Sequence, residues 1–341
     1  MKRAGWMLTA VSATLALAIP AFGQGVKMEK VTFMGEPNCY RLTNGTIDVV
    51  VTTNIGPRVI RYGFVGGQNE FAELPDVTTP TTLGTWHIWG GHRLWHSPEA
   101  MPRSYSPDNS PIEWKKVGDN RIDLIEPVEP ATGIQKEIDV TLDSTGTRVV
   151  VVHKLTNKGL WPVRLACWAM SAMHAGGRAI FPQEPFFSHT EKLGPSRPLV
   201  LWGYTNMADH RWTWGRLFIQ FRNDPNVSEP QKFGIGNTLG WAAYERNHEL
   251  FMVRFPYIEG AKYPDMGCDN ESYTDNHFLE LETLSPLVTL DPGKTVSYTE
   301  DWYLFKGVHL GDTDESIQRG IEPLVKETVP TPVAEAFIPP H

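Results

Sequence analysis

The segment from Gly90 to Glu99 holds the densest group of chemically useful side chains in this chain. It reads Gly-Gly-His-Arg-Leu-Trp-His-Ser-Pro-Glu, so two imidazoles, a guanidinium, an indole and a carboxylate follow two glycines. Glycines let a backbone turn or approach a ligand closely, and indole faces with one N–H donor suit the partly apolar, partly hydroxylated faces of a sugar ring. We therefore predict a binding site here, although a polar loop over an edge of the core is the alternative. The predicted site residues of this segment, with one tryptophan just before it, are Trp89, His92, Arg93, Trp95 and His96.

Two carboxylates near the C-terminus form a second candidate site. Glu280 and Glu282 alternate with leucines in a run that favours a strand, so both side chains point to one face. A carboxylate in such a strand must meet a partner, a pocket or water, because burial alone costs free energy. A solvated strand face is the alternative, above all for Glu280.

An arginine and a polar loop add further candidates. Arg58 lies beside a Gly-Pro turn in an early predicted strand, and we expect it to reach the predicted binding site together with Arg93. Two guanidinium groups could bind a carboxylate or sulfate through bidentate hydrogen bonds, whereas surface ion pairing is the alternative. The loop 263–277 offers Glu271 and Tyr273 to a ligand. Its oxygens could hold calcium, but their spacing matches no calcium loop, and we predict neither a metal nor a cofactor.

The elements that must position these residues are nearly all strands. An Asn-Gly pair at 44–45 between two alternating runs predicts a hairpin, and similar runs continue to about residue 305. One helix is predicted from about 314 to 326, with cap oxygens before it. No linker or internal repeat divides the chain. We predict one all-β domain over 24–328, built as a large antiparallel sandwich with a short C-terminal helix, and a Pro-rich tail over 329–341.

The first 23 residues have the pattern of a cleavable secretory signal, with Lys2, Arg3, an apolar run and a small-residue segment up to Gly23. No later run reaches the roughly 20 apolar residues of a membrane span. We expect a periplasmic or secreted protein without stable membrane insertion after cleavage, and a retained N-terminal anchor is the alternative. Cleavage changes the net charge from −8 to −10, with 29 Lys and Arg against 39 Asp and Glu. This acidity argues against nucleic acid as a partner.

The three cysteines show no spacing typical of a metal site or redox pair. Cys39 and Cys167 lie in apolar, strand-like segments, where a thiol acts as a small hydrophobe. Cys268 lies in a polar loop and could be exposed. One disulfide could form among them in an oxidising compartment.

The order of these features resembles the galactose mutarotase-like superfamily, which includes the aldose 1-epimerases. The resemblance rests on the run 281–283 with its Leu-x-Pro-Gly turn at 290–293 and closing aromatic strand, on the Gly-Gly pair at 90–91, and on the Asn-containing turn at 155–163. It implies a β-supersandwich of two large antiparallel sheets, with a carbohydrate site in a groove across the larger one. It also implies Glu282 as the general base at the anomeric centre, with Glu280 as the alternative.

One position departs from the family pattern. The resemblance places Trp168 where the family has the histidine that protonates the ring oxygen, and an indole cannot deliver a proton at neutral pH. The acid would then be His92, His96 or His174, although His174 could equally cap a loop. We expect an exported, aldose 1-epimerase-like isomerase acting on a mono- or oligosaccharide. The alternatives are a non-catalytic glycan-binding protein, which Trp168 favours, and a polysaccharide lyase or hydrolase that uses the same groove.

Overall fold

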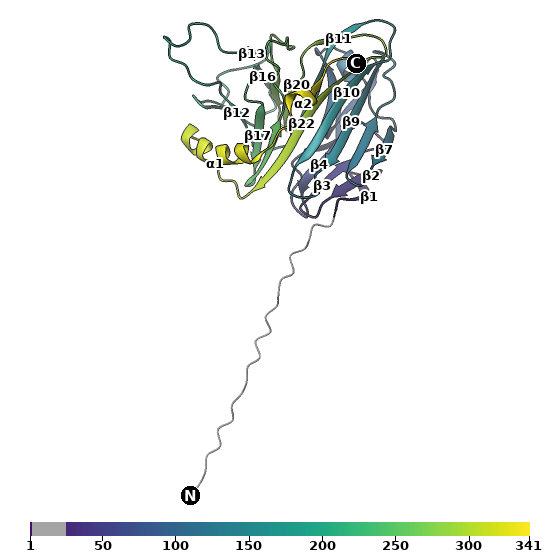
Figure 1. The fold of residues 1–341 in the computed structure, drawn as a ribbon, viewed down its shortest axis with the longest axis horizontal. Coiled ribbons are helices and arrows are strands. Elements are labelled where there is room, and N and C mark those ends of the chain that lie inside the picture. The colour runs from purple at the N-terminus through teal and green to yellow at the C-terminus, as the bar shows by residue number, and fades with distance from the viewer. Residues whose placement is uncertain (2–24) are drawn as a thin grey trace.

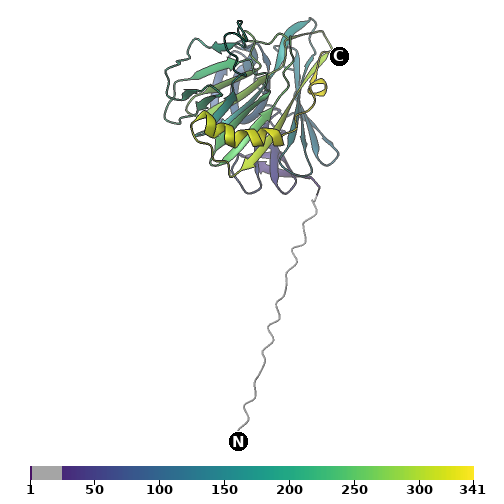
Figure 2. The same ribbon diagram turned by 60° about the vertical axis from the view of Figure 1, so that its left-hand side comes forward.

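Two large antiparallel sheets pack face to face in the computed structural model, which describes residue 1 and residues 25–341 (Figures 1 and 2). The predicted all-β sandwich is therefore confirmed. The predicted signal segment lies, apart from Met1, outside the described residues. None of the helices in the described part has the length and apolar character needed to span a bilayer.

The first sheet has twelve strands within the described residues. They are β1 (Lys27–Phe33), β2 (Glu36–Thr43), β3 (Ile47–Val51), β4 (Val59–Phe64), β5 (Glu73–Thr81), β6 (Gly84–Ser97), β11 (Val163–His174), β13 (Leu199–Leu201), β16 (Gln231–Ile235), β19 (Asn270–Thr274), β20 (Phe278–Leu284) and β21 (Val288–Leu290). Their order is β1-β2-β3-β4-β6-β11-β20-β19-β16-β13, with β5 beside β6 and β21 beside β11. The centre of this sheet therefore joins β6, β11 and β20, which are far apart in the sequence.

The second sheet has eleven strands in the same part of the chain. They are β7 (Glu113–Val117), β8 (Arg121–Ile125), β9 (Ile134–Leu142), β10 (Val149–Asn157), β12 (Arg178–Pro182), β14 (Trp212–Trp214), β15 (Phe218–Arg222), β17 (Trp241–Arg246), β18 (Glu249–Arg254), β22 (Thr295–Lys306) and β23 (Phe337–Ile338). Their order is β14-β15-β12-β17-β18-β22-β10-β9-β8-β7, with β23 beside β22. Apolar side chains of both sheets, such as Val151, Leu281 and Trp302, form the main core between them.

The predicted helix is present as α1 (Asp314–Glu327), and Thr313 caps it by accepting a hydrogen bond from the Ser316 N–H. The helix α1 lies against the outer face of the second sheet (Figure 2). Its Ile317 and Ile321 belong to a separate apolar cluster there. The Pro-rich tail over 329–341 contains regular secondary structure, which the sequence analysis did not predict. It contains the short helix α2 (Val333–Ala336) and then β23, which pairs with β22. A single-turn helix, η1 (Arg103–Tyr105), follows β6.

The Gly-Gly pair allows β6 to lie against two neighbouring backbones. Trp89, Gly90 and Gly91 all have positive φ, at 54°, 85° and 69°. A Cβ atom on Gly90 would lie 1.9 Å from the carbonyl oxygen of Ala72, and one on Gly91 would lie 2.4 Å from that of Val59. The two glycines thus allow a close approach of strands.

We expect Gly90→Ala to lower the free energy of unfolding by at least about 2 kcal/mol, because a backbone clash adds to the strain of a positive φ. Chemical unfolding followed by tryptophan fluorescence measures this change. The matched control is Gly35→Ala, since Gly35 has a φ of 82° but a Cβ atom added there would meet nothing within 4 Å. An equal loss in both variants would show that φ strain, and not strand approach, explains the glycine at 90.

Candidate functional site

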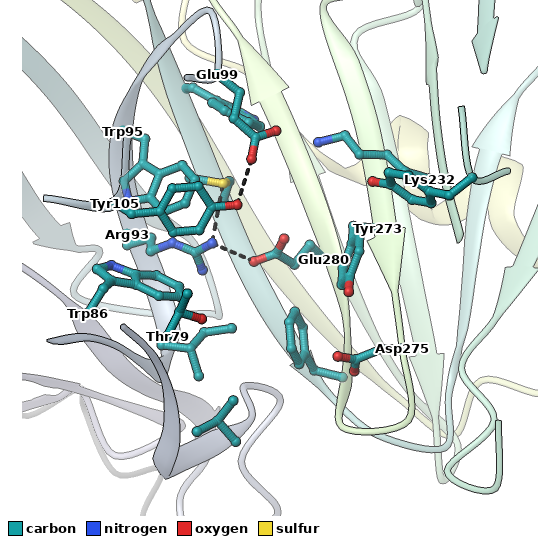
Figure 3. Close-up of a pocket in the computed structure, with 16 residues that line it drawn as sticks. Thr79, Trp86, Arg93, Trp95, Glu99, Tyr105, Lys232, Tyr273, Asp275 and Glu280 are labelled. Carbon is teal, nitrogen blue, oxygen red and sulfur yellow. Dashed lines mark hydrogen bonds and ion pairs between the residues drawn. The ribbon is translucent and has the colours of Figure 1, made fainter. Parts of the chain in front are cut away.

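A pocket of about 210 Å³ opens on the outer face of the first sheet, over β6, β11, β16, β19 and β20 (Figure 3). Aromatic rings cover much of its wall. The Trp95 ring lies 5.5 Å from that of Trp168 and 5.4 Å from that of Trp86, and Tyr105 packs edge-on against Trp86 and Trp95. Pockets that combine aromatic walls with a few convergent polar groups are typical of ligand sites.

Arg93 and Glu280 form an ion pair across this pocket (Figure 3). Arg93 Nη2 lies 2.8 Å from Glu280 Oε1, although β11 separates their strands. The guanidinium carbon lies 4.8 Å from the ring centre of Trp95 and 5.4 Å from that of Trp86, within cation–π range. Within the described residues, Arg93 Nε and Nη1 are buried without a hydrogen-bond partner. Arg93 therefore keeps donors available for a ligand.

Lys232 of β16 is the second cation at the pocket wall. Its Nζ lies 2.9 Å from Glu282 Oε2 and 3.1 Å from Glu271 Oε2, and 4.6 Å from the Trp168 ring centre. The Trp168 indole donates a hydrogen bond of 2.8 Å to Glu282 Oε2. Glu282 is fully buried and lies behind the pocket, whereas Glu280, two residues earlier, lines it. Both carboxylates thus share one face, as predicted, but only Glu280 can meet a ligand directly.

Lys232 and the two carboxylates beside it shift one another's pKa values. Burial alone would lower the pKa of Lys232, but the Glu282 and Glu271 carboxylates outweigh it and raise this pKa well above its usual value. Burial raises the pKa of Glu282 to about 7 against the opposing effect of Lys232. Burial also raises the pKa of Glu271 well above its usual value, and the neighbouring Glu282 adds to this. Lys232 is therefore a fixed cation and not a base.

The rim of the pocket carries hydroxyl and carboxylate groups. Tyr105 donates a hydrogen bond of 2.6 Å to Glu99 Oε1 (Figure 3). Burial raises the pKa of Tyr105 and that of Tyr273 above the usual value, and nearby carboxylates add to the effect. These phenols therefore stay protonated and act as hydrogen-bond donors. Asp275 supplies a further carboxylate at the same pocket.

The structure brings together about half of the predicted site residues. The predicted residues that line the pocket are Arg93, Trp95, Trp168, Tyr273 and Glu280. Glu271 and Glu282 lie buried directly behind it through their contacts with Lys232.

The predicted histidines lie elsewhere. His92 and His96 point into the sandwich, because they alternate along β6 with the outward-facing Arg93 and Trp95. His92 Nε2 lies 2.7 Å from His153 Nε2, and His96 Nε2 lies 3.1 Å from Glu129 Oε2. His174 is exposed at the end of β11. The expected pairing of a histidine with Glu282 in one groove is therefore not formed.

Arg58 and Trp89 also lie away from the pocket. Arg58 is fully buried, pairs with Asp108 at 2.7 Å, and donates to the carbonyl oxygens of Ile88 and Gly90. Its guanidinium therefore holds the backbone of β6 beside the two glycines. The Trp89 ring stacks on His87 at 4.8 Å, and its Nε1 donates to Asn109.

Cys268 is buried, although its polar loop made exposure one possibility. Cys39, Cys167 and Cys268 are all free and buried, and each is 0% exposed. Cys268 packs close to the backbone of Gly234, and its Sγ donates to the Asp265 carbonyl oxygen at 3.1 Å. The polar loop therefore buries the side chain of its own cysteine.

Sequence reasoning missed several residues of the pocket. The main ones are Tyr105, Tyr204 and Lys232, whereas Trp86, Glu99 and Asp275 line the pocket from segments within or next to those that the sequence had singled out. Lys232 alternates with Phe233 and Ile235, both in the main core, and this period of two was a signal that its side chain faces outward. Tyr204 lies outside the strands, and its place at the pocket depends on long-range packing.

We predict a pH dependence of stability from Asp269, just before β19. Its Oδ1 accepts the Asn237 N–H at 2.7 Å, and its buried Oδ2 has no hydrogen-bond partner among the described residues. Burial raises the pKa of Asp269 to about 8. Because the folded pKa exceeds the unfolded one of about 3.9, its contribution is complete below that value and is lost as the pH rises through 8.

We therefore expect Asp269→Asn, which stays neutral, to be more stable relative to wild type at pH 8.5 than at pH 4. Urea unfolding at both pH values measures the difference, which should reach a few kcal/mol. Asp76→Asn on the exposed side of β5 is the control. A constant difference between Asp269→Asn and wild type across this range would contradict the prediction.

The comparisons with known proteins show that this chain is similar in fold to several solved structures. No family model and no curated sequence matches the chain. A TPR-domain containing protein from Parabacteroides distasonis matches with a TM-score of 0.55 and 13% identity, over 80% of this chain and 48% of that one, so this chain spans about half of its length. The Slr1438 protein of Synechocystis matches at 0.49 and 12%, over 82% and 100%. A galactose mutarotase-like protein from Lactobacillus casei matches at 0.47 and 11%, over 79% and 100%. The structure itself confirms the two-sheet sandwich that the resemblance implied, and at these identities the likeness to solved structures concerns the fold alone.

Proposed function

We propose that this protein binds a saccharide in the pocket on the first sheet. The observation that carries the proposal is the convergence of indole faces with Arg93, Lys232, Glu280 and Asp275 in one hollow. Indole faces pack against the C–H faces of a pyranose ring, and charged groups bind its hydroxyls strongly. The lining carboxylates of Glu99, Asp275 and Glu280 outnumber the two cations. A neutral sugar therefore suits the pocket better than an acidic one.

A second candidate function is acid–base chemistry at the anomeric centre of that sugar. It is favoured by the carboxylate of Glu280, which lines the pocket on the late strand where a general base was expected. Glu282 is less suited because Trp168 and Lys232 occupy its oxygens. Within the described residues no histidine lines this pocket. The acid would then be the Tyr105 phenol, which donates a hydrogen bond to Glu99, and a phenol is a weaker acid than an imidazolium ion. Binding without turnover is thus the leading proposal.

Calorimetry with neutral mono- and oligosaccharides tests the binding proposal. We expect Trp95→Ala to weaken binding at least about tenfold, because an aromatic contact in a buried site is lost. Trp161→Ala is the control, since Trp161 is 75% exposed in a turn away from the pocket. Thermal unfolding of each variant shows that it is folded. Equal affinities for Trp95→Ala and wild type, or no affinity for any saccharide of the panel, would contradict the proposal.

Anomer exchange distinguishes the second function from the first. A freshly dissolved pure anomer is followed by NMR with wild type, with Glu280→Gln and in buffer alone. A rate above buffer that Glu280→Gln abolishes would establish catalysis by Glu280. A rate equal to buffer, together with measurable binding, would leave a binding protein.

We also propose that the protein is exported to the periplasm or secreted. The support is the signal pattern of residues 1–23, namely two cations, an apolar run and a small-residue segment. Mass spectrometry of the protein from its native host tests this. A chain that begins near Gln24 in the exported fraction is expected, and an intact N-terminus in the cell interior would contradict it.

A further inference from the structure

A cluster of polar side chains lies inside the sandwich, among the apolar residues of the main core. His92, Ser171 and Thr283 come from the first sheet, and His153 and Glu300 come from the second. Each is at most 3% exposed. None of them lines the pocket described above. Polar groups in an apolar core cost free energy unless they are well paired, so their partners decide what the cluster does.

Both imidazoles direct an Nε2 atom to the centre of the cluster. His153 Nδ1 lies 3.0 Å from the Tyr298 carbonyl oxygen, which can only accept, so the proton is on Nδ1 and Nε2 carries a lone pair. His92 Nδ1 lies 2.9 Å from Ser171 Oγ. When that hydroxyl accepts, His92 Nε2 also presents a lone pair, 2.7 Å from His153 Nε2. With the protons in these places the two lone pairs repel each other, whereas a Ser171 hydroxyl that donates to His92 Nδ1 lets His92 Nε2–H donate a hydrogen bond to His153 Nε2.

The carboxylate of Glu300 has neutral partners in this core. Thr283 donates to its Oε1 at 2.5 Å, and the Trp302 indole donates to its Oε2 at 2.8 Å. His92 Nε2 lies 4.0 Å from the same Oε2. No lysine or arginine pairs with Glu300 within the described residues. In contrast, the acidic group of Asp123, Glu137 and Asp139 on the second sheet is balanced by Arg121 and Lys154.

We propose that His92, His153 and Glu300 bind a divalent transition-metal ion, Zn²⁺ in the first place, which links the two sheets from inside. The three ligand atoms lie within 4.8 Å of one another. Ligands at about 2.0–2.1 Å from a tetrahedral ion lie roughly 3.3 Å apart. The observed separations of 2.7 and 4.0 Å lie on either side of this value. Two imidazoles and a carboxylate suit Zn²⁺, and the hydrogen bond at Nδ1 of each ring would orient its Nε2 towards the ion.

Such an ion would have a structural role. The ligands come from β6, β10 and β22, so the ion connects the two sheets at the centre of the sandwich. The full burial of the site means that the metal enters while the chain folds and stabilises the folded state by its binding free energy.

The test uses the mature chain without a metal-binding tag. The protein is unfolded in guanidinium with EDTA, then refolded with Zn²⁺, with Co²⁺ or without metal, and passed over a desalting column. We expect about one ion per chain by elemental mass spectrometry, visible absorption of a low-symmetry Co²⁺ site, and a higher melting temperature with metal. Refolded wild type with less than about one tenth of an ion per chain would overturn the proposal, because the short contact would then be a proton-bridged imidazole pair.

Variants assign the ligands. We expect His153→Gln to lower the metal content at least about tenfold, because a neutral amide is a poor ligand for Zn²⁺. His174→Gln is the matched control, since this histidine is exposed and should leave the metal content unchanged. Equal metal content in His153→Gln and wild type would place the ion elsewhere and overturn the assignment. The wild-type measurement decides the proposal even where His153→Gln does not fold.

Discussion

Lys232→Met is expected to lower the free energy of unfolding by about 3–5 kcal/mol at pH 8, because breaking a buried ion pair leaves an uncompensated charge. Lys232 is 4% exposed, and its Nζ contacts Glu282 at 2.9 Å and Glu271 at 3.1 Å. Both carboxylates are fully buried. Without the cation, at least one of them must bind a proton or draw water into the sheet face. Chemical unfolding of the variant and wild type measures the loss.

The pH dependence of this loss follows from the carboxylates. Removing Lys232 removes the effect that opposes burial at Glu282, so the pKa of Glu282 rises beyond about 7. A carboxyl group with a raised folded pKa contributes stability at low pH that is lost as the pH rises through that pKa. The deficit of Lys232→Met should therefore be smaller at pH 5 than at pH 8. An equal deficit at both values would mean that lost packing, and not charge, explains it.

Two further variants separate charge from volume. Adding Glu282→Gln to Lys232→Met removes one unpaired charge. We expect the double variant to recover part of the lost unfolding free energy, because the effects of residues in contact are coupled. Lys115→Met on the exposed strand β7 is the control and should change stability by less than about 0.5 kcal/mol. A Lys232→Met variant as stable as Lys115→Met would contradict the role of Lys232 as the buried counter-ion.

The fold could be predicted because it is encoded by local patterns. The Asn-Gly pair joins β2 and β3 because Asn44 accepts the N–H groups of Thr46 and Ile47 within the turn. The helix α1 begins at the expected position because Thr313 caps it. Period-two alternation likewise predicted that Glu280 and Glu282 share one face. Each of these features depends on residues within a few positions of one another.

The pocket depends on strand order, which local patterns do not contain. Arg93 meets Glu280 only because β11 lies between β6 and β20. Lys232 reaches Glu282 across β19 in the same way. The inward orientation of His92 and His96 could have been predicted from the sequence, because these residues alternate with Arg93 and Trp95. The prediction of one site from all four residues did not apply this alternation, which puts the two imidazoles on one face of β6 and Arg93 and Trp95 on the other.

Glu280→Gln is expected to change the ligand preference of the pocket from neutral towards acidic sugars. In the wild type, the Glu280 carboxylate lies 2.8 Å from Arg93 and neutralises it. Arg93 is only 3% exposed and lies between two indole rings. The glutamine variant leaves this buried guanidinium without an anion, which costs stability. A ligand carboxylate can then take the place of Glu280 through a bidentate pair.

We expect the affinity for glucuronate relative to glucose to rise at least about tenfold in Glu280→Gln, equivalent to roughly 1.4 kcal/mol. Calorimetry with both sugars gives this ratio of affinities. Because glucuronate and glucose differ at one carbon, the ratio reports the contribution of the ligand carboxylate alone. Added salt should reduce the gain only slightly, since buried pairs are screened less than exposed ones. Glu99→Gln is the matched control, because it removes a charge from the exposed rim while leaving the Arg93–Glu280 pair intact. An unchanged ratio in Glu280→Gln, or an equal rise in Glu99→Gln, would mean that Arg93 does not face the bound sugar.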